Sequence, residues 1–166
     1  MRKLRNFILL LSVLLPINSL AVNYVGSDNV LSLEGINGIF IAIEGIDEHA
    51  TRSGITASML TNEVQSALSK SEIKILSDKE VINTPGRPVL IVSVNVFRNI
   101  NDTSYSTEVS LNQIVLMQRN TKILAHIPTW SIKSAGMASN DSAGQEILKY
   151  ILLSLDEFTK AYKRSK

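Results

Sequence analysis

The middle of the chain alternates apolar and polar residues with a period of two, which predicts β-strands. In Val89–Arg98 every second residue from Leu90 to Val96 is a branched aliphatic residue that can face a core. Ser104–Arg119 continues the alternation, and its other face carries serine, glutamate and asparagine. An antiparallel sheet can keep one face in water in this way. The pattern therefore predicts two adjacent strands with one apolar face and one polar face.

Three further segments are also predicted to be strands. Gly38–Glu44 places isoleucines at alternate positions, and Ile73–Leu76 is a short apolar run expected at a sheet edge. Lys122–Lys133 is expected to return after a tight hairpin turn at Asn120-Thr121. Because proline cannot donate a ladder hydrogen bond, Pro128 indicates a bulge or an edge position in this last strand.

Two segments have helical periodicity. Ser53 is a candidate cap for a helix that runs to Lys70, with apolar residues on one face and polar residues on the other. Near the end of the chain, Ser142 and Gln145 match the spacing of a capping box. The apolar stripe that follows is made of Ile147, Ile151, Leu155, Phe158 and Tyr162. Both helices are expected to pack on the core.

The predicted order of elements is β-α-β-β-β-β-α over residues 36–166. Such an order predicts a single α+β domain, with a mostly antiparallel sheet and two helices packed on one face. Residues 22–35 mix glycine, serine, asparagine and aspartate with scattered apolar residues, so they are expected to form a flexible leader.

The amino terminus has the three parts of a secretory signal peptide. Arg2, Lys3 and Arg5 precede the uncharged, mostly apolar run Phe7–Leu15, and small residues end the segment at Ala21. The apolar run is shorter than the ~20 residues that span a bilayer, so cleavage is favoured over a retained anchor. We therefore expect residues 1–21 to be a signal peptide and the protein to be periplasmic, or alternatively secreted.

Removal of that peptide changes the charge of the protein. The whole chain of 166 residues has a formal charge of +2, whereas residues 22–166 carry fourteen lysines and arginines against fifteen carboxylates. A near-neutral charge and 5% aromatic residues argue against a nucleic-acid-binding protein. The chain has no cysteine, which excludes disulfides, thiolate metal sites, a cysteine nucleophile and a lipid-modified cysteine. No cofactor is expected.

One loop could in principle bind a cation. Asp47, Glu48 and His49 follow the first predicted strand, close to Glu44, and carboxylate and imidazole groups are metal ligands. However, the chain lacks the paired-histidine spacings of zinc enzymes, so a solvated acidic loop is the favoured interpretation.

Catalytic motifs are absent from the sequence. There is no nucleophile elbow, no S-x-x-K motif followed by a K-T-G element and no phosphate-binding glycine loop. His126 and Trp130 are expected on one face of a strand, and an active site there would require both to converge with Glu108 in a pocket. A protein that is not an enzyme is therefore expected.

Two surfaces are candidates for interactions. The polar side of the predicted sheet, including Glu108 and Asn112 together with His126 and Trp130, could serve as a docking surface. The basic carboxy-terminal residues suit the end of a helix dipole, and contact with anionic lipid is a less favoured alternative. These basic residues are Lys160, Lys163, Arg164 and Lys166.

The order of elements, with GIFIAIEGI in the first strand and LDEFTKAY in the last helix, resembles several small periplasmic domains. These are the amino-terminal domain of the Tol-Pal propeller protein and the curli-secretion and penicillin-binding-protein-activator lipoproteins. The chain also resembles exported bacterial proteins with a threonine and a tryptophan near the last strand, here Thr129 and Trp130. Where the lipoproteins have a lipid-modified cysteine this chain has Ala21, so the resemblance does not imply a lipid anchor.

The resemblance implies a non-enzymatic interaction or accessory module of an envelope or secretion assembly. Its partner would be another envelope protein or a second copy of the chain, bound through the edge or the face of the sheet. The alternative hypothesis is a periplasmic domain that binds a small ligand or a metal at the Glu44–His49 loop.

Overall fold

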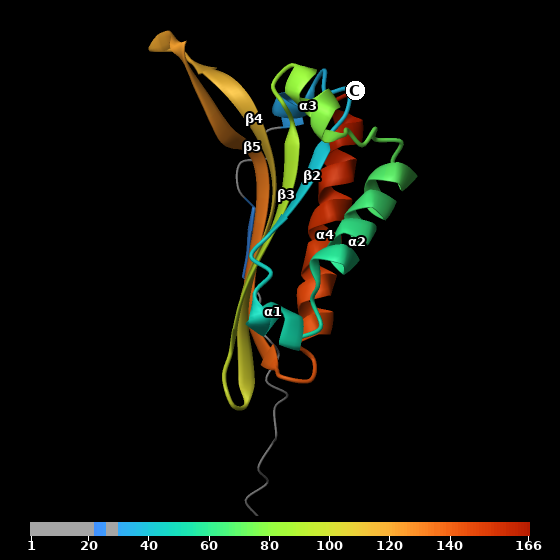
Figure 1. Ribbon diagram of the computed structural model, residues 1–166, viewed down its shortest axis with the longest axis vertical. Coiled ribbons are helices and arrows are strands. Elements are labelled where there is room, and N and C mark those ends of the chain that lie inside the picture. The colour runs from blue at the N-terminus through green and yellow to red at the C-terminus, as the bar shows by residue number, and fades with distance from the viewer. Residues whose placement is uncertain (1–21, 26–29) are drawn as a thin grey trace, which may run out of the picture.

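The computed structural model describes residues 22–25 and 30–166. The signal peptide predicted for residues 1–21 lies outside the described residues. Figure 1 shows a long twisted sheet with two long helices against one face. The elements of the described chain are β1 (Val22–Val25), the 3-10 helix η1 (Val30–Leu33), β2 (Phe40–Glu44), α1 (Glu48–Arg52), α2 (Ala57–Lys70), α3 (Asp78–Asn83), β3 (Val89–Arg98), β4 (Asp102–Met117), β5 (Asn120–Ser139) and α4 (Ala143–Arg164).

The sheet has the strand order β1-β5-β4-β3-β2. Strand β2 runs parallel to β3, whereas the pairings of β3 with β4, β4 with β5 and β5 with β1 are antiparallel. Parallel neighbours need a long crossover, and here the chain between β2 and β3 contains α1, α2 and α3. The prediction of an α+β domain with a mostly antiparallel sheet and two helices on one face is confirmed.

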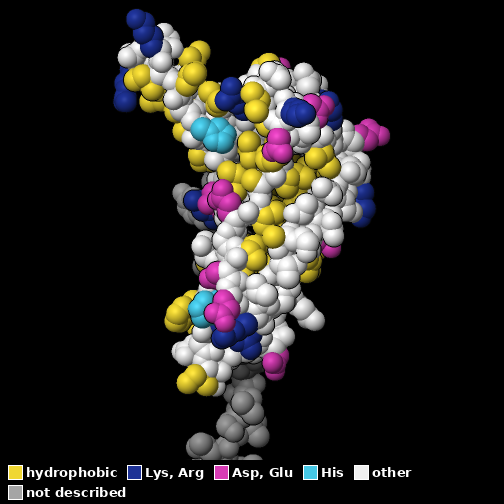
Figure 2. Space-filling view, in the orientation of Figure 1, with side chains coloured by type: hydrophobic (Ala, Val, Ile, Leu, Met, Phe, Trp, Pro, Cys, Tyr) yellow, Lys and Arg dark blue, Asp and Glu magenta, His cyan; other side chains and the backbone are white. Residues whose placement is uncertain are grey.

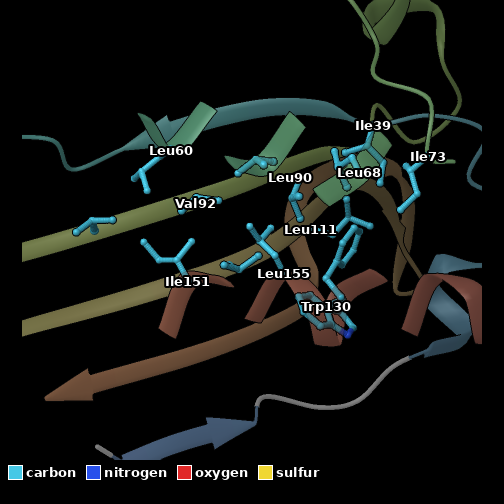
Figure 3. Close-up of a cluster of buried hydrophobic side chains, with 14 of the residues drawn as sticks. Ile39, Leu60, Leu68, Ile73, Leu90, Val92, Leu111, Trp130, Ile151 and Leu155 are labelled. Carbon is cyan, nitrogen blue, oxygen red and sulfur yellow. The ribbon is translucent and has the colours of Figure 1, made fainter. Parts of the chain in front are cut away.

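The hydrophobic core lies between this sheet and helices α2 and α4 (Figure 3). The alternating residues of β3 and β4 face it as their pattern predicts, and α2 contributes Leu60, Val64 and Leu68. The ring of Trp130 meets that of Phe158 edge-on, with 5.0 Å between the ring centres. Aromatic pairs favour this edge-to-face geometry. Helix α4 is fixed to the sheet along its whole apolar stripe.

The first predicted helix is divided into two. Helix α1 ends at Arg52, and Gly54 takes a positive φ of +84° that breaks the helical path. Helix α2 then starts after Thr56, whose side chain accepts a hydrogen bond from the Met59 amide at 3.2 Å. The cap predicted at Ser53 is therefore wrong, because Ser53 lies at the end of α1.

Predicted caps and strands also differ from the structure around α3 and α4. Residues 73–76 do not form a strand, apart from a single bridge between Ile75 and Ile39. The capping box is formed by Ser77 and Glu80 at the start of α3. Ser142 precedes α4 but makes no side-chain cap, since its backbone is helical (φ −103°, ψ −11°) and a capping side chain needs an extended backbone.

The segment expected to be a flexible leader, residues 22–35, is partly built into the fold. Strand β1 pairs with residues 132–135 of β5, and η1 buries Leu33 in the core. Tyr162 at the end of α4 donates a hydrogen bond to the Ile36 carbonyl at 2.7 Å. These contacts depend on segments more than a hundred residues away, so the local sequence does not reveal them.

Strands β4 and β5 extend well beyond β3. Strand β3 has 10 residues, whereas β4 has 16 and β5 has 20. The pairing of β3 with β4 stops at Asn112, and from there to the turn β5 is the only strand paired with β4 in the described chain. We call residues 113–127 the arm. Figure 1 shows it projecting from one end of the molecule.

Candidate functional site

The arm leaves the sheet at a junction of three segments. The Ile114 amide donates a hydrogen bond to the Gly86 carbonyl at 2.7 Å. The Gln113 side-chain amide donates to the Ser32 carbonyl at 2.9 Å and to the Thr129 hydroxyl at 2.8 Å. Gly86 has a positive φ of +74°, which glycine adopts without strain, so the turn before β3 can approach the arm. These bonds fix where the arm begins.

A β-bulge at Thr129 determines which way two predicted site residues face. Trp130 and Pro128 pair with consecutive residues of β4, which leaves Thr129 as an extra residue in β5. An extra residue reverses the alternation of faces, so His126 and Trp130 lie on opposite sides of the ribbon and not on the same side. Trp130 is 4% exposed and packs on Phe158. The prediction that Trp130 belongs to an interaction surface is wrong.

Large apolar side chains are exposed along the arm. Leu116 and Leu124 form a cross-strand pair and are 62% and 65% exposed. Ile123 and Ile127 are 43% and 40% exposed. Figure 2 shows hydrophobic side chains along the projection. Because exposed apolar patches of this kind mark interaction sites, the arm is the strongest candidate for a binding surface in the described chain.

The charge of the arm has one sign. Arg119 and Lys122 lie at its tip, and residues 113–127 contain no aspartate or glutamate. The turn is formed by residues 118 and 119, two residues before the position predicted from the sequence. His126 is exposed on the same arm. The arm therefore presents apolar sides and a basic tip, shown in dark blue in Figure 2.

The polar face of the sheet has a shallow groove of about 420 Å³. Glu108 forms one wall and is paired with Lys133, with 3.2 Å between the carboxylate oxygen and the ammonium nitrogen. Asn112 is half-buried on the same face, and its side-chain oxygen has no hydrogen-bond partner among the described residues. Trp130 lies in the core, whereas His126 pairs with Ile114 on the same sheet face as Glu108 but belongs to the arm, so the three side chains do not converge.

The loop considered for cation binding forms the start of α1. The Asp47 carboxylate accepts a hydrogen bond from the Ala50 amide at 2.9 Å, and Glu48 is paired with Arg52. The His49 ring lies 5.8 Å from that of Phe97. In the described part of the chain, no three histidine, aspartate or glutamate side chains are grouped so that they could hold a metal ion. Asp47 instead caps α1, Glu48 pairs with Arg52 within that helix, and the His49 ring packs beside Phe97.

Burial shifts the pKa of one tyrosine. Desolvation raises the pKa of Tyr105 to about 12, and the neighbouring Tyr150 and Glu146 add smaller effects in the same direction. The Tyr105 hydroxyl is buried close to Gly136 and has no hydrogen-bond partner in the described part of the chain. A phenol with a raised pKa stays protonated at neutral pH, so Tyr105 is not a base.

The basic carboxy terminus is only partly free to bind a charged partner. Lys160 is paired with Asp156 and Glu157, and these hydrogen bonds raise its pKa. The Lys166 ammonium lies 4.9 Å from the centre of the Tyr162 ring, within the range of a cation–π contact. Several of the basic residues at the helix end therefore have partners within α4 itself.

Comparisons with known proteins reveal no family. No family model matches the chain, and no curated protein matches it. Among solved structures, a dodecameric PelC variant from Paraburkholderia phytofirmans is similar with a TM-score of 0.45 and 11% identity, over 83% of this chain and 96% of that one. A likeness at this level establishes no shared function. Within the described residues, no helix is both long and apolar enough to cross a membrane.

Sequence reasoning did not single out the apolar residues of the arm as a surface. Leu116 has the same parity as Glu108 and Asn112, so the alternation places it on the polar side of the predicted strand, where a single apolar residue is common on a protein surface. The feature of the sequence that could have indicated this surface is the difference in length between two predicted strands. The predicted strand at 104–119 is longer than its predicted neighbour at 89–98, and the excess has no partner to cover it.

Proposed function

We propose that this protein is an exported, non-enzymatic interaction module that docks on a protein of the cell envelope through the arm. The observation that carries the proposal is the exposure of four leucine and isoleucine side chains outside the core, on a hairpin held in place at its base. The signal-peptide pattern of residues 1–21 and the resemblance to periplasmic accessory domains support the envelope as the location.

The exposed apolar side chains of the arm favour a bound state. Fully burying one leucine or isoleucine side chain is worth about 1.5–3 kcal/mol, so covering even two of the four is worth a substantial binding energy. A two-stranded ribbon without a core is also only marginally stable in water. A partner that covers the ribbon would supply the missing contacts.

The test is site-specific photocrosslinking in the organism that makes the protein. A photoreactive phenylalanine is placed at Leu124 on the arm, and the matched control places it at Gln65, an exposed position on α2. We expect a protein adduct from position 124 and none from position 65. A second substitution, Leu116→Ser, should reduce the adduct from position 124 at least tenfold, because it removes an apolar contact worth about 1.4 kcal/mol or more.

Two outcomes would contradict the proposed function. One is the absence of any protein adduct at position 124 while the protein is folded and exported. The other is an equal yield of the same adduct from both positions, which would mean random collision and not docking through the arm.

A further inference from the structure

Charge is separated along the length of the molecule. The arm, residues 70–87 around α3 and residues 163–166 at the carboxy terminus lie at one end, as Figure 1 shows by the arm, α3 and the label C. Together they carry nine lysines and arginines against three carboxylates. The other described residues carry five lysines and arginines against eleven carboxylates. The arm therefore belongs to a basic end, and the rest of the described chain is acidic.

The opposite end has its own exposed apolar residues. Phe97, Ile100 and Met137 are 65%, 89% and 58% exposed. Phe97 and Met137 lie in one row across the sheet, since both pair with Ser104. We call the end formed by α1, the turn between β3 and β4, and the start of α4 the far end.

Carboxylates surround the apolar residues of the far end. Asp102 and Asp141 are exposed there, and neither is in an ion pair with any described residue. Arg98 is half-buried and directs its guanidinium to the carbonyl oxygens of Arg52 and Asn140. The far end thus combines exposed apolar side chains with unpaired negative charge.

We propose that the arm of one copy of this chain binds the far end of a second copy. The inference rests on the proposed function of the arm and names its partner. Both surfaces are apolar, and their charges are opposite, so contact buries both patches and brings Arg119 and Lys122 toward Asp102 and Asp141. Contact between two arms would instead bring like charges together, which disfavours it.

The test is a charge-swap experiment with the exported protein. One variant carries Arg119→Glu and Lys122→Glu on the arm, and the other carries Asp102→Lys and Asp141→Lys at the far end. Light scattering after size-exclusion chromatography is expected to show self-association of the wild type. Each variant alone should associate at least tenfold more weakly, because each then has like charges on its arm and its far end. An equimolar mixture should regain association, since each copy then meets a complementary surface.

The matched control reverses two carboxylates away from both surfaces, with Glu63→Lys and Glu157→Lys. This variant has the same net charge as the far-end variant and is expected to associate as the wild type does. Circular dichroism establishes that every variant is folded. Association of the control together with weak association of both swapped variants would support contact at these two surfaces.

Three results would overturn the inference. The first is a wild type that stays monomeric at all concentrations. The second is a mixture that associates no better than its components. The third is a monomeric wild type whose arm binds vesicles of anionic lipid, with binding lost in the arm variant. If the crosslink at Leu124 nevertheless captures a different protein, the proposed function stands and only the identity of the partner is wrong.

Discussion

At the residue scale, glycine and tyrosine positions show how tightly α4 and β5 fit their neighbours. A Cβ atom on Gly144 would lie 2.0 Å from the Ser53 carbonyl oxygen, and one on Gly136 would lie 2.7 Å from the Tyr105 hydroxyl. The first contact is with backbone, which cannot rotate away. Gly144 is therefore needed where α4 starts against the end of α1.

We predict that Gly144→Ala destabilises the protein although alanine is the better helix former. Alanine gains about 1 kcal/mol in helix propensity, whereas forcing an extra methyl group against backbone costs about 1–3 kcal/mol and can cost more. Because a 2.0 Å approach is far inside contact distance, we expect the clash to dominate, with a lower midpoint of urea unfolding. Gln145→Ala, at the next and exposed position, is the control and should not lower the midpoint. An unchanged or raised midpoint for Gly144→Ala would contradict the packing described for α4.

We predict that Tyr105→Phe leaves the free energy of unfolding unchanged or slightly higher. The hydroxyl is buried without a partner, so the folded protein loses no hydrogen bond when it is removed. The ring contact with Tyr150 is retained, since the ring centres are 6.3 Å apart and the ring stays. Urea unfolding measures the effect, and a loss above about 1 kcal/mol would show that the hydroxyl has a partner in solution.

At the element scale, the start of α3 is stabilised by charge. Glu80 accepts hydrogen bonds from the Lys74 ammonium at 2.7 Å and from the Ser77 amide at 2.9 Å. The hydrogen bond from Lys74, followed by those from the backbone and side chain of Ser77, lowers the pKa of Glu80 from 4.5 to about 2. A lowered pKa means that the folded protein favours the charged carboxylate.

This shift predicts a pH dependence of stability. A carboxylate with a lowered pKa adds stability above its unfolded pKa of 4.5, and this is lost as the pH falls toward about 2. We expect the wild type to exceed Glu80→Gln in stability at neutral pH and the difference to shrink between pH 4.5 and 2. Unfolding of both proteins across that range measures it. An NMR titration of Glu80 with a midpoint near 4.5 would contradict the prediction.

We expect the rest of the protein to fold without the arm. None of the arm's residues belongs to the core cluster of the described chain. Beyond the junction with Gly86 and Ser32, its two strands pair only with each other among the described residues. We predict that deleting 116–124 and joining Val115 to Ala125 with an Asn-Gly turn leaves the melting temperature within a few degrees of the wild type. Val115 and Ala125 already face each other, so a two-residue turn fits. A loss of more than about 10 °C would mean that the arm contributes to the fold.

At the scale of the whole molecule, an arm and a far end of opposite charge make association sensitive to salt. Raising the salt concentration from about 0.01 M to about 1 M shortens the Debye length from about 30 Å to about 3 Å. We therefore expect the wild type to associate more weakly as salt rises toward physiological strength, as light scattering would show. The double arm variant should show the opposite trend, because salt then screens repulsion. An association of the wild type that does not change with salt would mean that charge has no part in it.

The sequence by itself determined the local pattern. The period-two alternation in 89–98 and 104–111 assigned the buried face of β3 and β4 correctly, because a pleated strand sends alternate side chains to opposite faces. The helical spacing of apolar residues also predicted the buried face of α4 and that of α2 correctly. These features were predictable because each depends on residues only a few positions apart, and together they were enough for the fold class.

Only the tertiary structure decided which apolar residues remain exposed. Val115 and Leu111 share one face of β4, yet Val115 is only partly buried and Leu111 is in the core, since β3 pairs with β4 only as far as Asn112. Trp130 turned inward because one extra residue at Thr129 reversed the faces of β5. The candidate site depends on both facts, and both follow from the pairing of distant strands, whose lengths and register are fixed by long-range contacts and not by local pattern.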